Sequence, residues 1–380
     1  MQNRPPARSA SRQPATVKPA TVKPATVKPA TVKPTTVKPT TVKPATLKAV
    51  AAAAGVHLST ASRALDPAKR HLIAAEVAAR IEAEARRLGY RRDAAAASLR
   101  TRRSRLVGVL VPDIANPVFS PIISGVSESL SAQGYSTIVA DVGSDPKRQA
   151  ALVDELIARR VDGLILATVR RDDAVLRHCL ETRLPVVLVN RADESGRVPA
   201  VVSDDLHGMK LAVDHLVALG HRRIGHIAGP AHLSTGHLRR QGFEAAMKAH
   251  GLKIPAGGIS TAKAYEREAG ESAAAALLAI KPRLSAIVAA NDLLALGLLR
   301  ALRARGLTCP SDLSVVGHND MPLVDMIDPP LTTVRIGPRE MGQDAAKLLL
   351  SALEGQPGDP AQRVMLRPTL IPRASTAALK

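Results

Sequence analysis

The sequence has 380 residues, 46% of them hydrophobic, which is enough for several domains with sizeable cores. It contains no apolar stretch near the roughly 20 residues of a membrane-spanning helix and no apolar signal-peptide centre in residues 1–45, so we expect a cytoplasmic protein. The net charge of +20 is concentrated at one end of the chain. Residues 1–105 hold 22 Lys and Arg against 5 Asp and Glu, whereas residues 106–380 hold 31 Lys and Arg against 28 Asp and Glu. This asymmetry indicates a polyanion-binding segment joined to a nearly neutral body.

Residues 15–44 repeat the five-residue unit Ala/Thr-Thr-Val-Lys-Pro six times. The proline in every unit rules out a continuous helix and restricts the lysine before it to extended conformations. We therefore expect a disordered tail over residues 1–45 with a bias towards polyproline II. Two interpretations stay open, a low-complexity expansion with little function and an arm that holds DNA nonspecifically through Arg4, Arg8, Arg12 and the repeat lysines.

Residues 46–66 predict two short helices that meet at a tight corner. The first is indicated by four apolar residues at helical spacing, Leu47, Val50, Ala51 and Ala54. It ends at Gly55, which can adopt the left-handed conformation of a helix C-terminus. The second begins near Leu58, and three apolar residues recur in it at helical spacing, Ala61, Ala64 and Leu65. Two helices joined in this way are typical of the helix-turn-helix that binds DNA.

The exposed side of the second helix is mostly polar and comprises Leu58, Ser59, Thr60, Ser62 and Arg63. Such a row suits phosphates and base edges. On these residues alone, the alternative is an ordinary pair of packed helices in an alanine-rich chain. A third helix is predicted over residues 74–88, where apolar residues again recur at helical spacing, and it would complete a small all-α headpiece over residues 46–92.

Motifs of this region occur together, and in the same order, in one known family. They are Thr46-Leu47 with Val50-Ala51, Ala54-Gly55-Val56, Thr60 with Ser62-Arg63-Ala64-Leu65, Leu88-Gly89-Tyr90 and Ser98-Leu99-Arg100. On these motifs the chain, from Thr46 to about Ile371, resembles the LacI family of bacterial transcription regulators. The resemblance implies a repressor that binds a pseudopalindromic operator in double-stranded DNA as a homodimer. It also implies a small-molecule effector, a sugar or a related metabolite.

The resemblance assigns roles to individual residues at the DNA. Base edges would be contacted by Leu58, Ser59 and Arg63, and phosphates by Thr46, Thr60 and Ser62. Residues 93–105 match the family's hinge helix and linker, with Ala96 and Leu99 at the minor groove. Leu99 would act as an apolar wedge that partly unstacks a base step, although plain packing is the alternative for a leucine in an alanine-rich helix. Arg92 and Asp93 stand where the family usually has proline and asparagine.

The body, residues 106–380, alternates apolar runs with helical segments. The runs lie at residues 106–111, 135–140, 161–167, 185–190, 223–228, 284–289 and 313–317. Continuous apolar runs are typical of parallel strands that are buried on both faces, so the pattern predicts doubly wound α/β layers. The body is long for one sheet, and we expect two lobes with a ligand cleft at the carboxyl ends of the strands. The resemblance likewise implies a periplasmic-binding-protein-like domain for effector binding and dimerisation.

Polar residues follow five of these strands and predict a small-molecule site. Asn190 and Arg191 end the fourth strand. The resemblance assigns the effector contacts to Asn116, Phe119, Asn190, Arg239, Asn291 and Asn319. The guanidinium of Arg239 can hold two oxygens of a sugar or a carboxylate. Asn319 offers one donor and one acceptor where the family often has two acceptors, which argues against an ordinary aldohexose. For any one of these residues alone, a loop cap or a surface group is the alternative.

Other classes of function find little support. The histidines are scattered and no serine lies in a Gly-x-Ser-x-Gly motif, so we expect no enzyme and no catalytic residue. Cys179 and Cys309 lack metal-ligand spacing, and no phosphate-binding glycine motif is present, so we expect no metal and no cofactor. Two alternatives stay open, an architectural DNA-binding protein without an effector and a solute-binding protein. The basic headpiece and the missing export signal argue against the second.

Overall fold

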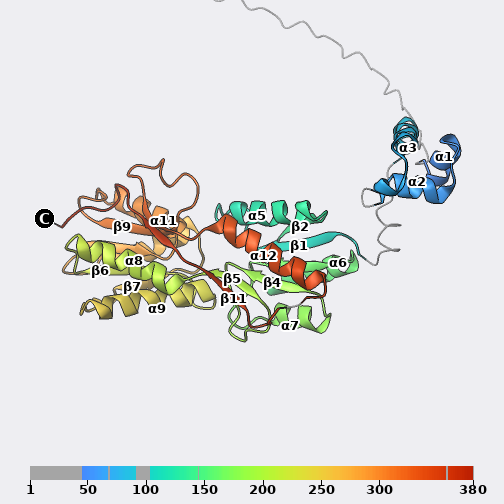
Figure 1. The fold of residues 1–380 in the computed structure, drawn as a ribbon. Coiled ribbons are helices and arrows are strands. Elements are labelled where there is room, and N and C mark those ends of the chain that lie inside the picture. Colours follow the sequence, from blue (N-terminus) through green and yellow to red (C-terminus); the bar gives the residue numbers. More distant parts are fainter. Residues whose placement is uncertain (1–44, 67–68, 91–102, 144, 357, 380) are drawn as a thin grey trace, which may run out of the picture. The chain divides into compact units, whose positions relative to one another are not determined.

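The structure is a computed structural model that describes residues 45–66, 69–90, 103–143, 145–356 and 358–379 (Figure 1). The chain divides into two compact units, Met1–Arg92 and Asp93–Lys380. The repeat tail and the hinge positions Ala96 and Leu99 lie outside the described residues. Within the described ranges, no helix is long and apolar enough to cross a membrane.

The described part of the first unit is helical. Its elements are α1 (Leu47–Ala53), α2 (Leu58–Ala64), the 3-10 helix η1 (Arg70–Leu72) and α3 (Ala75–Arg87). The predicted corner is confirmed, because Gly55 has a φ of +63° just beyond the C-cap of α1. The core is formed by the apolar faces of all three α-helices, namely Val50, Ala51, Ala54, Ala61, Ala64, Ala78, Ile81 and Ala85. Small residues at the α1–α2 contact allow the two helices to approach closely.

The second unit begins with a lobe built on a six-stranded sheet of order β11-β5-β4-β3-β1-β2. Its strands are β1 (Leu106–Val111), β2 (Ser136–Asp141), β3 (Gly163–Leu166), β4 (Val186–Val189), β5 (Ala200–Ser203) and β11 (Arg363–Leu366). All neighbouring strands are parallel. Its helices are α5 (Phe119–Ala132), α6 (Pro146–Ala158), α7 (Ala174–Glu181) and α12 (Pro338–Leu353).

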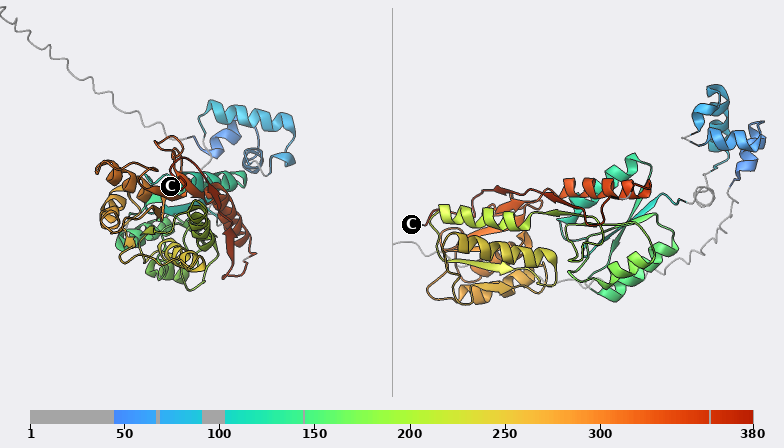
Figure 2. Two further views of the ribbon diagram at one scale, coloured as in Figure 1. Left: turned by 90° about the vertical axis from the view of Figure 1, so that its left-hand side faces the viewer. Right: turned by 60° about the horizontal axis from the view of Figure 1, so that its bottom comes forward.

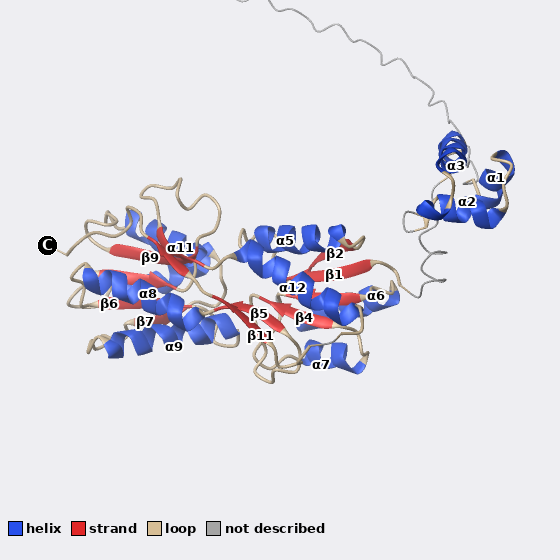
Figure 3. Cartoon of the chain, in the orientation of Figure 1, coloured by secondary structure: helices blue, strands red, loops and turns tan. Residues whose placement is uncertain are grey.

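Both faces of this first sheet are covered, as continuous apolar strands require. Val107 and Val109 pack on the side of α5 and α12, where the core includes Ile122 and Leu349. Leu110 packs on the opposite side, with residues of α6 and α7. Successive residues of β1 therefore serve two separate cores, and helices lie on both sides of the strands (Figure 3).

The second lobe repeats this plan with the strand order β12-β10-β9-β8-β6-β7. Its strands are β6 (Ile224–Ala228), β7 (Ile259–Thr261), β8 (Ala286–Ala289), β9 (Ser314–Asn319), β10 (Thr332–Arg335) and β12 (Thr369–Ile371). Only β10 and β12 pair antiparallel among these described strands. Helices α8 (Asp205–Ala218) and α9 (Ser234–Ala249) contribute to one core, and α10 (Arg267–Leu278) and α11 (Asp292–Arg303) to the other.

The chain crosses between the two lobes three times within the described residues. The crossings follow β5, β10 and β11, and Figure 2 shows the lobes that they join. The first and third crossings are tied together, because the backbone N–H of Asp204 donates to the carbonyl oxygen of Leu366 at 3.0 Å. The second passes through Gly337, whose φ of +65° lies in the left-handed region. Neither lobe is a continuous segment of the sequence.

The predicted α/β class with two parallel-sheet lobes is confirmed. The seven predicted strands correspond to β1, β2, β3, β4, β6, β8 and β9. The prediction missed β5, β7, β10, β11 and β12, which have three or four residues each. Length is not the whole reason, since β3, β4 and β8 also have four residues; each missed strand contains a Ser, Thr or Arg that shortens its apolar run further.

Candidate functional site

All six residues that the resemblance assigns to the effector line one cavity between the lobes. The remaining wall is formed by Val118, Arg191, Thr235 and Tyr265. Residues 116–119 and 190–191 come from the first lobe, and the others come from the second. The cavity has a volume of about 20 Å³, which is room for about one water molecule. A sugar-sized ligand therefore requires a rearrangement of the cavity walls.

A second, larger cavity continues from the first. It has a volume of about 320 Å³ and shares Asn116, Arg191 and Tyr265 with the small one. Its wall also includes Arg170, His232 and Lys263, together with the carboxylates of Asp113 and Glu266. The two cavities together offer a path from the strand ends to solvent.

The asparagines of the small cavity are held by the local backbone. Asn116 accepts a hydrogen bond from Val118 N at 3.2 Å, and Asn291 accepts one from Leu294 N at 2.9 Å as the N-cap of α11. Asn190 and Asn319 have positive φ values of 64° and 116°. With both carbonyl oxygens engaged, the amide groups of Asn116 and Asn291 have no hydrogen-bond acceptor among the described residues. They are available to donate to a ligand.

Arg239 on α9 is buried and held at two points. Its Nε donates to Oδ1 of Asp205 at 2.8 Å, and its Nη1 donates to the carbonyl oxygen of Ala290 at 2.6 Å. Burial works against the charge of Arg239, but Asp205 outweighs it and the pKa of the guanidinium is raised. The side chain is therefore charged and fixed before any ligand arrives.

Arg191 is the second guanidinium in the cavity wall, and its surroundings differ from those of Arg239. Its side chain is buried, and its Nε has no hydrogen-bond partner in the described part of the chain. Burial lowers the pKa of Arg191 to about 10, so the group is still charged at neutral pH. The small cavity thus has two arginines and four asparagines in its wall, and no carboxylate among the residues that line it.

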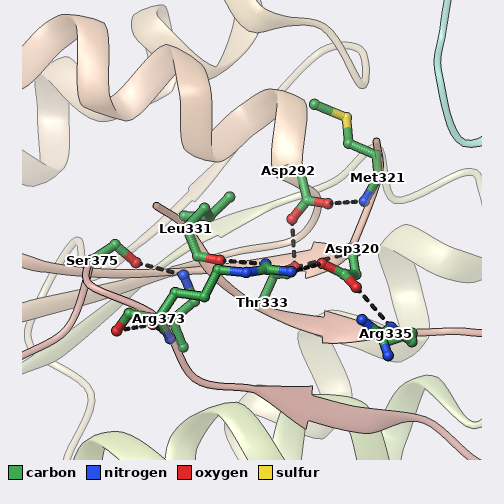
Figure 4. Close-up of polar contacts among 9 residues, drawn as sticks. Asp292, Asp320, Met321, Leu331, Thr333, Arg335, Arg373 and Ser375 are labelled. Carbon is green, nitrogen blue, oxygen red and sulfur yellow. Dashed lines mark hydrogen bonds and ion pairs between the residues drawn. The ribbon is translucent and has the colours of Figure 1, made fainter. Parts of the chain in front are cut away.

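Asp292 and Asp320, the residues that follow Asn291 and Asn319 in the sequence, belong to a polar network (Figure 4). The carboxylate of Asp292 accepts hydrogen bonds from Thr333 Oγ1 at 2.6 Å and from Met321 N at 2.9 Å. Asp320 pairs with Arg335 and with Arg373, each at 2.7 Å. Asp320 follows Asn319 directly, so its two ion pairs help to hold Asn319 in its unusual backbone conformation at the cavity.

The predicted DNA-binding residues of the headpiece lie on and beside α2. Leu58 is 45% exposed, Ser59 and Arg63 are exposed, and Thr60 and Ser62 are half-buried. The N-cap of α2 is His57, whose Nδ1 accepts hydrogen bonds from Ser59 N at 3.3 Å and from Ser59 Oγ at 2.8 Å.

Thr46 has a structural role in addition to the predicted phosphate contact. Its Oγ1 accepts a hydrogen bond from Ala49 N at 3.2 Å as the N-cap of α1. The hydroxyl hydrogen can still be donated to a phosphate. Ala96 and Leu99, the other two predicted contacts, are not among the described residues.

Sequence reasoning missed part of the cavity wall. Arg191 was recognised with Asn190 as a polar residue at a predicted strand end, but no contact with the effector was assigned to it. Thr235 and Tyr265 had no such signal, because Tyr265 lies in a loop after the unpredicted strand β7. Over the residues that the structure describes, no cluster of three or more His, Cys, Asp or Glu could hold a metal ion.

Comparison with known proteins extends over both units. The family model of the periplasmic binding protein-like domain matches residues 213–376. The chain is 35% identical over 338 residues to the HTH-type transcriptional regulator MalR of Streptomyces coelicolor, which covers 87% of this chain and 96% of the relative. It is 33% identical over 328 residues to the ribose operon repressor of Escherichia coli, which covers 86% of this chain and 98% of the relative.

Solved structures agree with these relatives. The lac repressor dimer bound to operator and the anti-inducer ONPF has 28% identity and a TM-score of 0.78, and the match covers 88% of this chain and all of that one. The transcriptional regulator CelR in complex with cellobiose has 30% identity and a TM-score of 0.68, with coverages of 87% and 99%. The chain therefore belongs to the LacI family of DNA-binding transcription regulators.

Proposed function

We propose that the protein is a repressor that binds a pseudopalindromic operator as a homodimer and responds to a small effector with several hydroxyl groups. The observation that carries this proposal is the convergence of Asn116, Asn190, Asn291 and Asn319 with Arg239 on one cavity between two lobes. Amide groups donate and accept hydrogen bonds, so they suit hydroxyl groups. The site of action would be the cytoplasm, where the chain meets DNA.

At the operator, α2 would enter the major groove. Leu58, Ser59 and Arg63 would contact base edges, and the hydroxyl groups of Thr46, Thr60 and Ser62 would hold phosphates. Residues 93–105 would form the hinge, with Ala96 and Leu99 at the minor groove in the centre of the site.

The effector would bind where the lobes meet, so that closing or opening them changes the hinge. The relatives include a ribose operon repressor and the solved structures include a complex with cellobiose, which supports a sugar or a sugar derivative. Coupling of this kind is reciprocal, so an effector that weakens operator binding is itself bound less tightly in the presence of operator.

A homodimer is supported by the dimeric lac repressor and by exposed apolar side chains in the second lobe. Leu323 and Met326, in the loop between β9 and β10, are 72% and 78% exposed. Large apolar side chains that are exposed close together are typical of protein interfaces. We propose that both lobes contribute to the dimer contact.

The test begins with the full chain and random double-stranded DNA, from which bound sequences are selected and aligned. We expect a pseudopalindromic consensus that is bound by two chains. If no consensus is selected, the proposed repressor function is contradicted. Sugars are then tested for release of that operator and for thermal stabilisation, which reaches about 2.7 kcal/mol at 100 times the dissociation constant. An architectural DNA-binding protein would bind without a consensus and would show no stabilisation.

A further inference from the structure

We propose that the effector is an anion, a sugar that carries a phosphate or a carboxylate group, and that Arg191 is the residue that binds this group. The inference rests on the proposed function and narrows the effector to one chemical class. It arises from the contrast between the two buried arginines of the cavity.

The first observation is the missing counterion of Arg191. The residue is 7% exposed, its Nε has no partner, and no Asp or Glu lies within ion-pair distance of it among the described residues. Arg239, at 2% exposed, is paired with Asp205 at 2.8 Å. A buried charge without a partner is strongly unfavourable, and a bound anion would remove that cost.

The second observation is the position of Arg191 at the junction of the two cavities. A ligand whose hydroxyl groups lie among the asparagines would extend past Arg191 into the larger space. That space is also lined by Arg170 and Lys263, so its wall holds three cationic side chains.

The other charged groups of the larger cavity are two carboxylates and a histidine. Asp113 accepts a hydrogen bond from Ala115 N at 2.9 Å, and Glu266 is exposed. Burial, with Arg170 and Arg191 next in effect, lowers the pKa of His232. Lys263 is exposed as well, so the lining carries three positive and two negative side chains. The buried charge among them is that of Arg191, next to which an anionic group would be placed.

The third observation is the absence of any carboxylate among the residues that line the small cavity. A neutral sugar would satisfy the asparagines but would leave Arg191 buried without a counterion. A phosphate or carboxylate oxygen can accept two parallel hydrogen bonds from a guanidinium, which gives both charge neutralisation and orientation. The wall therefore favours a ligand with hydroxyl groups at one end and a negative charge at the other.

The test uses matched ligands and the full chain. Titration calorimetry compares D-ribose with D-ribose 5-phosphate and D-ribonate, and D-glucose with D-glucose 6-phosphate and D-gluconate, with inorganic phosphate as the minimal anion. We expect at least one anion to bind tenfold or more tightly than its neutral counterpart. The phosphate and carboxylate members of each set then identify which anionic group is preferred.

Arg191→Gln should lower the affinity for the preferred anion by roughly 10- to 100-fold, because a hydrogen bond to a charged group is lost. The affinity for the neutral sugar should change little. Arg191→Lys should retain part of the preference. The matched control is Arg177→Gln, which removes an exposed positive charge of the same lobe and should leave all affinities unchanged.

Three results would overturn the inference: equal binding of the neutral and anionic members, no binding of any anion, or an unchanged preference in Arg191→Gln. None of these results would contradict the proposed repressor function if the chain selects an operator consensus. Failure to select one would instead contradict the proposed function, whatever the ligand charge.

Discussion

Arg239 and Asp205 form a buried ion pair that joins α9 to the first residue of α8, with Nε and Oδ1 2.8 Å apart. Burial raises the pKa of Asp205 and Arg239 opposes that rise, so each charge depends on the other. Arg239 lines the small cavity, and Asp205 fixes it there from outside the lining. The stability and the function of the ion pair are therefore linked.

Removal of either partner should destabilise the body by about 3–5 kcal/mol, because an uncompensated charge is left buried. Urea unfolding compares Asp205→Ala, Arg239→Ala and the double variant. The double variant should lose clearly less free energy of unfolding than the two single variants lose in sum. The control is the exposed pair Arg240–Glu244 on the same helix, where each single loss should be about 0.5 kcal/mol or less. Additive losses at the buried pair would contradict this account.

Arg63→Ala should weaken operator binding by about 1–3 kcal/mol and relax the preference at one position of each half-site. The reason is that Arg63 is exposed on α2 and, within the headpiece residues described, is paired with no carboxylate. Lys48→Ala, which removes an exposed charge from α1, should instead weaken the binding of all DNA sequences to the same extent. Selection from random DNA distinguishes the two, and a uniform loss in Arg63→Ala would rule out base recognition by this residue.

Gly55→Ala should destabilise the α1–α2 corner by about 1–2 kcal/mol, since a residue with a Cβ is strained at a positive φ. The effect is purely conformational, because a Cβ added at Gly55 would have no heavy atom within 4 Å. Gly55→Asn should cost less, since asparagine tolerates this conformation. Hydrogen exchange of the α1 and α2 amides in the full chain measures the loss of stability. Equal exchange rates in Gly55→Ala and Gly55→Asn would contradict the predicted difference between the two variants.

Arg191→Met should stabilise the unliganded chain by about 1 kcal/mol or more, because a buried charge without a counterion is replaced by an apolar side chain of similar length. Arg177→Met, at an exposed position of the same lobe, should change the free energy of unfolding by less than about 0.5 kcal/mol. Urea unfolding without ligand measures both. A loss of stability in Arg191→Met would mean that the guanidinium has a partner in the unliganded protein.

His226 should make the body less stable in mild acid. It is buried, stacks on Phe243 with ring centroids 4.7 Å apart, and donates from Nδ1 to Val288 O at 2.8 Å. Burial lowers the pKa of His226 from 6.5 to about 4. The unfolded chain therefore binds the proton first, and the stability present above pH 6.5 is lost as the pH falls towards 4.

The variant His226→Phe retains the stacking and removes the titrating group. Its free energy of unfolding should fall less between pH 6.5 and pH 4 than that of the wild type, even though the lost hydrogen bond to Val288 lowers its stability at neutral pH. Urea unfolding at a series of pH values gives both slopes. Identical slopes would show that the pKa of His226 is not lowered in the folded chain.

Seven strands, including the edge strand β2, could be predicted from the sequence. The edge strands β7, β11 and β12 could not, and neither could β5 and β10, which precede crossings. Thr332-Thr333 in β10 is polar in sequence yet buried, because Thr333 donates to Asp292 and Thr332 donates to Arg373 O. β11 and β12 are only partly buried, and each begins with a polar residue, Arg363 and Thr369. Their place in the sheets depends on distant partners, which a local pattern does not contain.

The candidate site, like the fold, could be predicted only in part from the sequence. Asn116, Asn190 and Asn291 follow recognisable strands, so a rule about strand ends brings them to one edge of their sheets. The ion pair of Arg239 with Asp205 could not be predicted, because Asp205 lies 34 positions away and has no local signal of its own. The unpaired state of Arg191 was likewise hidden, since it depends on which carboxylates other loops place nearby.

The three crossings have a consequence for synthesis on the ribosome. The first lobe needs α12 for its core and β11 for its sheet edge, yet both are made only after most of the second lobe. At ordinary translation speed, roughly 10 to 30 seconds separate the emergence of β5 from that of β11. During this time the part of one apolar sheet face that Met341, Ala345 and Leu349 later cover is open to solvent, while α5 covers the rest. The nascent chain is thus a natural client for chaperones, and a stalled or truncated product would aggregate although most of its strands are already complete.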